Sequence, residues 1–230
     1  MADYVKTIVY FQGSNENIQR MLNDLNPQKT GFFTLDKAIP MPAELRDRGL
    51  GMTNAVVVKL LSSTDDDLTI ESTKNRLNFY QKQKLYDLGI DPQTTIGDAK
   101  KQIREIPELA EHVALFDKYG ACDWYEWAKQ NIGTESFDAK FSISTDGKEK
   151  DCICIKGETK YKVPEPLIKE LAKRYDVQAD GYTIDDPFFH VGRIRTIDNE
   201  VKFAYYHDVR AKKDILKEYG VAEKYSAYFD

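Results

Sequence analysis

Sequence patterns typical of β-strands lie near the two ends of this chain, and the long stretch between them has the spacing of helices. The stretch Tyr4–Gln12 alternates in a way that predicts a strand covered on both sides. Gly13 stops this strand, and Ser14 can cap the following helix, whose apolar stripe runs over Ile18–Leu25. Residues 31–35 have the composition of a second strand. The chain therefore opens as strand, helix, strand.

The last third of the chain returns to strands. A half-buried strand over residues 137–144 leads through the turn signal Asp146-Gly147 to a returning strand over residues 151–156. Pro164 and Pro166 open a helix, since proline fits the first turn. Further strands are expected at residues 177–184, 188–197 and 201–207.

The stretch between these ends, residues 43–133, is predicted to be mainly helical. One apolar stripe in it consists of residues at helical spacing, namely Leu77, Tyr80, Leu85 and Leu88. Asp123 and Glu126 have the spacing of a capping box, which predicts a helix starting at Asp123 and ending at Gly133. The division that follows is a sheet domain over residues 1–42 and 134–230, with a mainly helical insertion over residues 43–133.

The last hairpin allows a prediction of strand register. If it turns through Asp198-Asn199, Ile194 lies opposite Phe203 and Arg195 lies opposite Lys202. The set of side chains that contains Ile194 is largely apolar, so it is predicted to form the core face. The set of side chains that contains Arg195 should be more exposed to solvent.

The amino-acid composition limits the classes of function that this chain can have. Lys and Arg number 33 against 38 Asp and Glu, so the formal net charge is -5 and the pI is near 5.4. This balance counts against non-specific nucleic-acid binding, which depends on clustered cationic charge. No stretch approaches the ~18–20 apolar residues that cross a bilayer, and the N-terminus lacks a signal-peptide pattern. With three Cys, unlike a secreted disulfide scaffold, we expect a reduced cytoplasmic protein without a membrane partner.

Several segments suggest a family. They are the opening strand-Gly-Ser-helix, Ile39-Pro-Met-Pro-Ala-Glu-Leu45, Asp123-Trp-Tyr-Glu-Trp127, Asn131-Ile-Gly-Thr134, Val163-Pro-Glu-Pro166 and Phe189-His-Val-Gly-Arg-Ile194. Together they resemble the YubB-type proteins of phages and conjugative plasmids. The resemblance covers the two ends and the Trp segment, and it is vague over residues 46–118. It implies a ferredoxin-like domain and a mobile-element setting but no reaction.

The sequence departs from that family at two places. Ile132 stands where the family usually has Trp before the Gly-Thr, and Glu135-Ser136 stands where it has Lys-Trp. If those Trp residues form a functional face in relatives, that face is altered here. The fold we expect is α+β, a ferredoxin-like antiparallel sheet with helices on one face. The mainly helical insertion lies between its second and third strands.

Two groups of residues are candidates for a binding face. Trp124 and Trp127 lie one helical turn apart and share a face with Asn131. Such a stripe is usually core, but exposed Trp is typical of interface anchors. Arg193 and Arg195 lie on one face of a strand and could bind a phosphate or an acidic partner. The alternative is a solvated sheet face.

The remaining candidates are imidazoles and thiols. The hairpin register places His190 opposite His207, where they could share a hydrogen bond or a ligand, although two His alone do not make a site. Cys152 and Cys154 alternate on a strand and are expected to be buried thiols. Cys122 could act as a nucleophile only beside a His. No catalytic, cofactor or metal site is predicted, and no cofactor.

Three functions remain open. The first is a non-enzymatic interaction or regulatory protein of a phage or plasmid, which binds a host or phage protein. The second is a nucleic-acid-binding module on the sheet, since ferredoxin-like sheets resemble RNA-recognition domains in topology. Against it stand the acidic balance and the absence of a Lys/Arg-Gly-Phe-Gly-Phe run. The third is an enzyme with a site at the cleft between sheet and insertion.

Overall fold

The computed structural model describes residues 4–26, 29–73, 77–136, 138–145, 151–186 and 190–228. The chain forms two compact units, Met1–Pro40 with Ala128–Asp230 and Met41–Trp127. The first, here called the sheet unit, holds the β-sheet, and the second, here called the helical unit, is built mainly from helices. The predicted strand starts at Phe137 and Phe188 and the predicted turn at Asp146-Gly147 lie outside the described residues.

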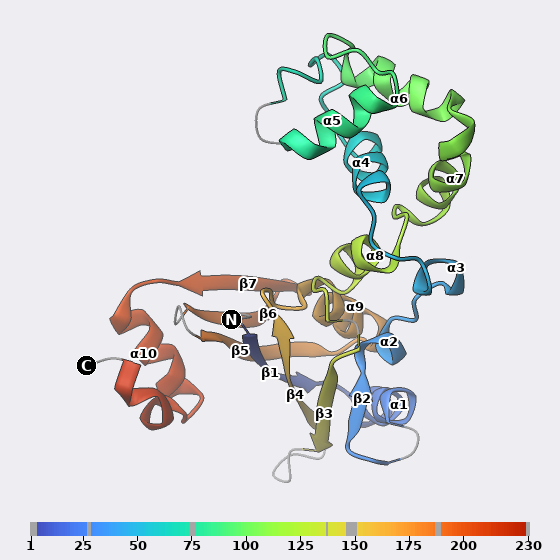
Figure 1. Cartoon of the computed structure of the whole chain (residues 1–230). Helices are drawn as coiled ribbons and strands as arrows, with labels where there is room; N and C mark the ends of the chain where they lie inside the picture. The colour runs from blue at the N-terminus through green and yellow to red at the C-terminus, as the bar shows by residue number, and fades with distance from the viewer. Residues whose placement is uncertain are drawn as a thin grey trace. The chain divides into compact units, whose positions relative to one another are not determined.

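The described strands of the sheet unit form one antiparallel sheet of seven strands. They are β1 (Tyr4–Gln12), β2 (Phe32–Thr34), β3 (Lys140–Thr145), β4 (Cys152–Lys160), β5 (Gln178–Asp186), β6 (His190–Ile197) and β7 (Glu200–Tyr206). β1 pairs along its length with β4 on one side and with β5 on the other. The order is β2-β3-β4-β1-β5-β6-β7 (Figure 1).

The expectation of a ferredoxin-like fold is wrong. The sheet is larger, because all the strand-like patterns at the two ends of the sequence join it. β6 and β7 extend it beyond β5, and β2 extends it beyond β3. Each added strand pairs backbone N–H and C=O groups that would otherwise stand at an open edge. The broader class is α+β, with an antiparallel sheet and helices packed on it.

Helices cover both faces of the sheet, whereas the sequence led us to expect them on one. On the first face, here called the α9 face, lie α1 (Asn15–Leu25), α2 (Leu35–Ala38) and α9 (Glu165–Tyr175). On the opposite face, here called the α10 face, α10 (Val209–Glu218) and η2 (Ala222–Tyr228) bury a separate cluster around Tyr182, Ile184 and Val191. Because successive side chains of a strand point to opposite faces of the sheet, one strand can contribute side chains to the cores on both faces.

The predicted register of the last hairpin is confirmed. Ile194 lies opposite Phe203 and Arg195 opposite Lys202. Ile194 is fully buried on the α9 face, as predicted for the core set. The set of side chains that contains Arg195 is not uniformly exposed to solvent, because Val191 belongs to it and is fully buried under α10. The sequence could not show that a later helix would return to this face.

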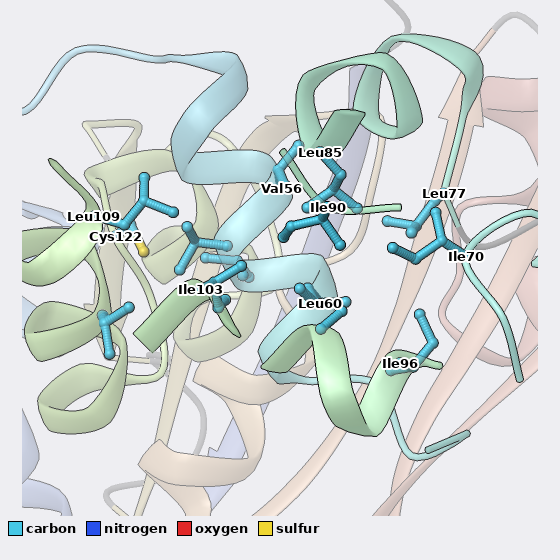
Figure 2. Close-up of a cluster of buried hydrophobic side chains, with 14 residues drawn as sticks. Val56, Leu60, Ile70, Leu77, Leu85, Ile90, Ile96, Ile103, Leu109 and Cys122 are labelled. Atoms are coloured by element: carbon cyan, nitrogen blue, oxygen red, sulfur yellow. The ribbon is translucent and has the colours of Figure 1, made fainter. Parts of the chain in front are cut away.

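The helical unit has its own core. Its helices are α3 (Ala43–Arg46), α4 (Met52–Leu61), α5 (Phe79–Asp87), α6 (Ile96–Glu105), η1 (Pro107–Leu109) and α7 (Ala110–Tyr119). α8 (Trp124–Asn131) starts in this unit and runs into the sheet unit. α4 is apolar nearly all round, as expected of an enclosed helix. Figure 2 shows Val56 and Leu60 of α4 among Leu85, Ile90 and Ile103 from its neighbours.

A buried polar link holds the start of α8. Asp123 is 2% exposed and accepts a hydrogen bond from the Glu126 backbone N–H at 2.9 Å, the N-cap bond predicted from the sequence. Its other carboxylate oxygen accepts from the Asn54 side-chain amide, also at 2.9 Å. Asn54 donates a further bond to the Gly49 carbonyl at 3.1 Å. Asp123 therefore caps one helix and satisfies a buried group of another.

We predict that Asp123→Ala lowers the free energy of unfolding by about 2–4 kcal/mol. The change removes the cap, worth about 1 kcal/mol, and leaves the buried Asn54 amide short of an acceptor, at about 1–3 kcal/mol. Ser14→Ala is the matched control, because Ser14 caps α1 at an exposed site through the Asn17 N–H. It should lose only about 1 kcal/mol. Equal losses in urea unfolding would contradict the role given to Asn54.

Candidate functional site

The Trp stripe lies on α8. Trp127 is 6% exposed, which is the burial of a core side chain, and Trp124 and Asn131 are half-buried. The Trp124 ring meets the Tyr125 ring edge-to-face, with centroids 5.7 Å apart. The structure thus places Trp127 as a packing residue and leaves Trp124 as the more accessible of the two.

The two candidate arginines are engaged by the protein's own carboxylates. Arg193 and Arg195 point to the α10 face, where both donate to Glu218 of α10, Arg195 at 3.0 Å. The Arg195 Nε also lies 3.6 Å from the Asp180 carboxylate. Their strand face is partly solvated, with Arg195 43% exposed, and it is not an open anion site, because α10 supplies the anion. The strand sequence alone does not contain this information.

We predict that Glu218→Gln lowers the free energy of unfolding by about 1 kcal/mol at low salt. Arg193 is only 21% exposed, so it keeps part of its charge desolvated when its carboxylate partner is removed. The loss should shrink in 1 M NaCl, because salt screens the pair. Glu200→Gln is the control, since Glu200 pairs with Lys202 at a site where both are mostly exposed. A loss as large in the control, or one that salt leaves unchanged, would contradict this assignment.

The two histidines come together where β6 starts, as the register predicted. The rings of His190 and His207 meet edge-to-face with centroids 4.9 Å apart. The His190 Nδ1 lies 3.8 Å from the Asp185 carboxylate on the paired strand. Within the described residues, no three His, Cys, Asp or Glu side chains are grouped closely enough to hold a metal ion.

His190 also borders a cavity of about 370 Å³ on the α9 face. The Tyr205 hydroxyl donates to Glu165 at 2.5 Å, and Lys169 lies 3.6 Å from the other Glu165 oxygen. Burial, followed by the bond to Glu165, raises the pKa of Tyr205 above its ordinary value, so its hydroxyl stays protonated. Within the sheet unit, the cavity has a size that suits a small ligand. Its charged and phenolic groups largely satisfy one another.

All three thiols are buried and none forms a disulfide, and burial is what the sequence led us to expect for Cys152 and Cys154. Cys122 is fully buried in the core of the helical unit (Figure 2). Its Sγ lies 3.3 Å from the His112 carbonyl oxygen. Burial, with a smaller contribution from Asp123, raises the pKa of Cys122 to about 12. A thiol with this pKa is a poor nucleophile at neutral pH.

An exposed aromatic pair on the helical unit was missed from the sequence. Phe79 is 73% exposed and Tyr80 is 69% exposed, and their rings meet edge-to-face with centroids 5.6 Å apart. The sequence placed Tyr80 on an apolar stripe with Leu77 and Leu85, and that placement is wrong. Leu77 and Leu85 are buried, whereas Tyr80 points outward. The signal available was the adjacency of two aromatics, since neighbouring helical positions point about 100° apart.

A capping box fixes the pair at the start of α5. The Asn78 side chain accepts from the Gln81 backbone N–H at 2.9 Å, and the Gln81 side chain accepts from the Asn78 backbone N–H at 3.0 Å. Behind it, Leu85 anchors the helix in the core. The two rings therefore stand on an ordered first turn.

Comparisons with known proteins add little. No protein-family model matches this sequence, and no match was found among curated proteins. Among solved structures, the chain is similar to the crystal structure of a protein api92 from Yersinia pseudotuberculosis, with the family model DUF1281. The TM-score is 0.43 and the identity 11%, over 90% of this chain and 99% of that chain. A similarity at this level supports no conclusion about fold or function, and the YubB-type resemblance stays a prediction.

In the described parts of the chain, no helix combines the length and the apolar character that crossing a bilayer requires.

Proposed function

We propose that this protein acts by binding another protein, and that Phe79 and Tyr80 of the helical unit are the anchors of that contact. The observation that carries the proposal is the exposure of two adjacent aromatic side chains, 73% and 69%, on an ordered helix start. Large apolar side chains gain free energy when a partner removes them from water. Aromatic side chains, Tyr and Trp above all, are the usual centres of binding energy in protein interfaces.

The setting of Phe79 and Tyr80 favours a specific contact. A partner that covers them need not order the helix first, because the capping box of Asn78 and Gln81 already holds its first turn. The rest of the outward face of α5 is polar, with Gln83 donating to Asp87 at 3.0 Å. Such a polar surround is typical of the rim around an apolar anchor.

The chemistry of the candidate groups supports binding over catalysis. The Tyr205 hydroxyl donates to Glu165 and its pKa is raised by burial and by this bond, and Cys122 is buried with a raised pKa. The proposal takes its setting, a mobile element acting on a host or phage protein in the cytoplasm, from the YubB-type resemblance.

The test compares the tagged full chain with a Phe79→Ser/Tyr80→Ser variant in the native host. We expect a protein that co-purifies with the parent chain to be lost from the double variant. With that partner purified, calorimetry should show an affinity at least about 30-fold weaker, as expected for anchors worth about 2 kcal/mol.

Leu50→Ser is the matched control, because Leu50 is also strongly exposed on the helical unit, at 60%. It should leave partner binding unchanged, and thermal melts should show that all variants fold. Equal binding of the partner by the parent chain and the double variant would refute the proposal.

A further inference from the structure

We propose that the sheet unit binds single-stranded nucleic acid on the half of its α10 face that no described helix covers. This function goes beyond the contact proposed for the helical unit and uses a different unit of the chain. It rests on three observations: an uncovered sheet surface, a local excess of lysine, and aromatic side chains on the same surface.

The surface follows from strand alternation. Ile8 and Tyr182 pack in the cluster under α10 and η2, which places the even-numbered side chains of β1 on the α10 face. The strand register places Lys156, Ser142 and Phe32 in one row with Ile8, so their side chains lie on the same face of the sheet. We call the α10-facing side chains of β2, β3, β4 and β1 the open sheet face. They are the even-numbered side chains of these four strands, and they are exposed or half-buried except for Cys152 and Cys154. Ile8 lies at the border of this face, where it meets the cluster under α10 and η2.

The open sheet face is basic although the chain is acidic. It carries four lysines, Lys6, Lys140, Lys156 and Lys160, against one carboxylate, Glu158, in a chain of net charge -5. Among the described residues, no ion pair involves Lys140, Lys156 or Lys160. This contrasts with Arg193 and Arg195 on the same sheet, which Glu218 engages. Lys140, Lys156 and Lys160 can therefore pair with an external anion.

Aromatic side chains lie on the same surface. Phe32 is 55% exposed at the β2 end of the register row that contains Lys156. Toward η2 the surface deepens into a hollow of about 410 Å³, lined among others by Tyr10, Lys156, Tyr182 and Lys224. The Tyr182 phenol is neutral at pH 7 and does not repel a phosphate, and burial, which raises its pKa to about 12, keeps it neutral in more alkaline solution.

Cations beside aromatic rings on an uncovered sheet surface match single-stranded nucleic acid. Lysines attract the phosphates, and aromatic rings stack on bases whatever their sequence. A duplex keeps its base faces stacked inside, so it could use the lysines but not Phe32. An acidic peptide would likewise use only the charges. The combination of Lys140 and Lys156 with Phe32 is what selects an unpaired strand.

The test measures fluorescence anisotropy of labelled 16-nucleotide oligo(dT) and oligo(U) with the purified full chain, between 25 and 200 mM salt. We expect binding that weakens with salt. Lys140→Gln/Lys156→Gln should reduce the slope of log K against log salt by about 0.7 for each phosphate that the variant no longer neutralises. Phe32→Ala should weaken binding by roughly fivefold or more and leave that slope unchanged, because it removes stacking and no charge.

Lys173→Gln is the matched control, since Lys173 is exposed on α9 at the opposite face of the sheet. It should bind like the parent chain, and so should Phe79→Ser/Tyr80→Ser, which separates this test from that of the helical unit. Duplex DNA that binds as tightly as oligo(dT), or polyglutamate that competes equally, would overturn the proposal. So would full binding by Phe32→Ala or by the double lysine variant.

Discussion

β1 pairs along its whole length with β4 on one side and β5 on the other, and the sheet unit is assembled around this double pairing. The strand comes first in the chain, yet its partners are contributed more than 130 residues later. The fit is close at Gly181, where an added Cβ would lie 2.2 Å from the Ile8 carbonyl oxygen. A side chain at that position would push β5 away from the central strand.

Because β1 is central, its two sides build two different layers. Val5, Val9 and Phe11 are buried on the α9 face, and Ile8 belongs to the cluster under α10. α10 and η2 cover the part of their face around β5 and β6, up to Ile8 of β1. The uncovered remainder is the open sheet face, so the extent of one C-terminal helix decides where the sheet meets solvent.

Ion pairing within the protein decides which cationic side chains can bind an external ligand. The arginines of β6 and the lysines of the open sheet face all lie on one side of one sheet. Glu218 engages Arg193 and Arg195, whereas Lys140 and Lys156 have no ion pair among the described residues. The negative net charge of the whole chain therefore does not describe the local charge of the open sheet face. The aromatic pair Phe79 and Tyr80 belongs to a unit with a separate core, which keeps the two proposed contacts independent.

Local patterns in the sequence determined the parts of the structure that depend on a few neighbouring residues. Examples are the Ser14 cap of α1, the Asp123 cap of α8 and the β6–β7 register with its histidine pair, since period, cap chemistry and turn position act over a few residues. Only the tertiary structure decided that seven strands share one sheet, that Glu218 engages the arginines and that Phe79 and Tyr80 stand in solvent. These outcomes depend on which segments, distant in the sequence, come into contact. Burial and ion pairing between such segments produce no periodic pattern in the sequence of either segment.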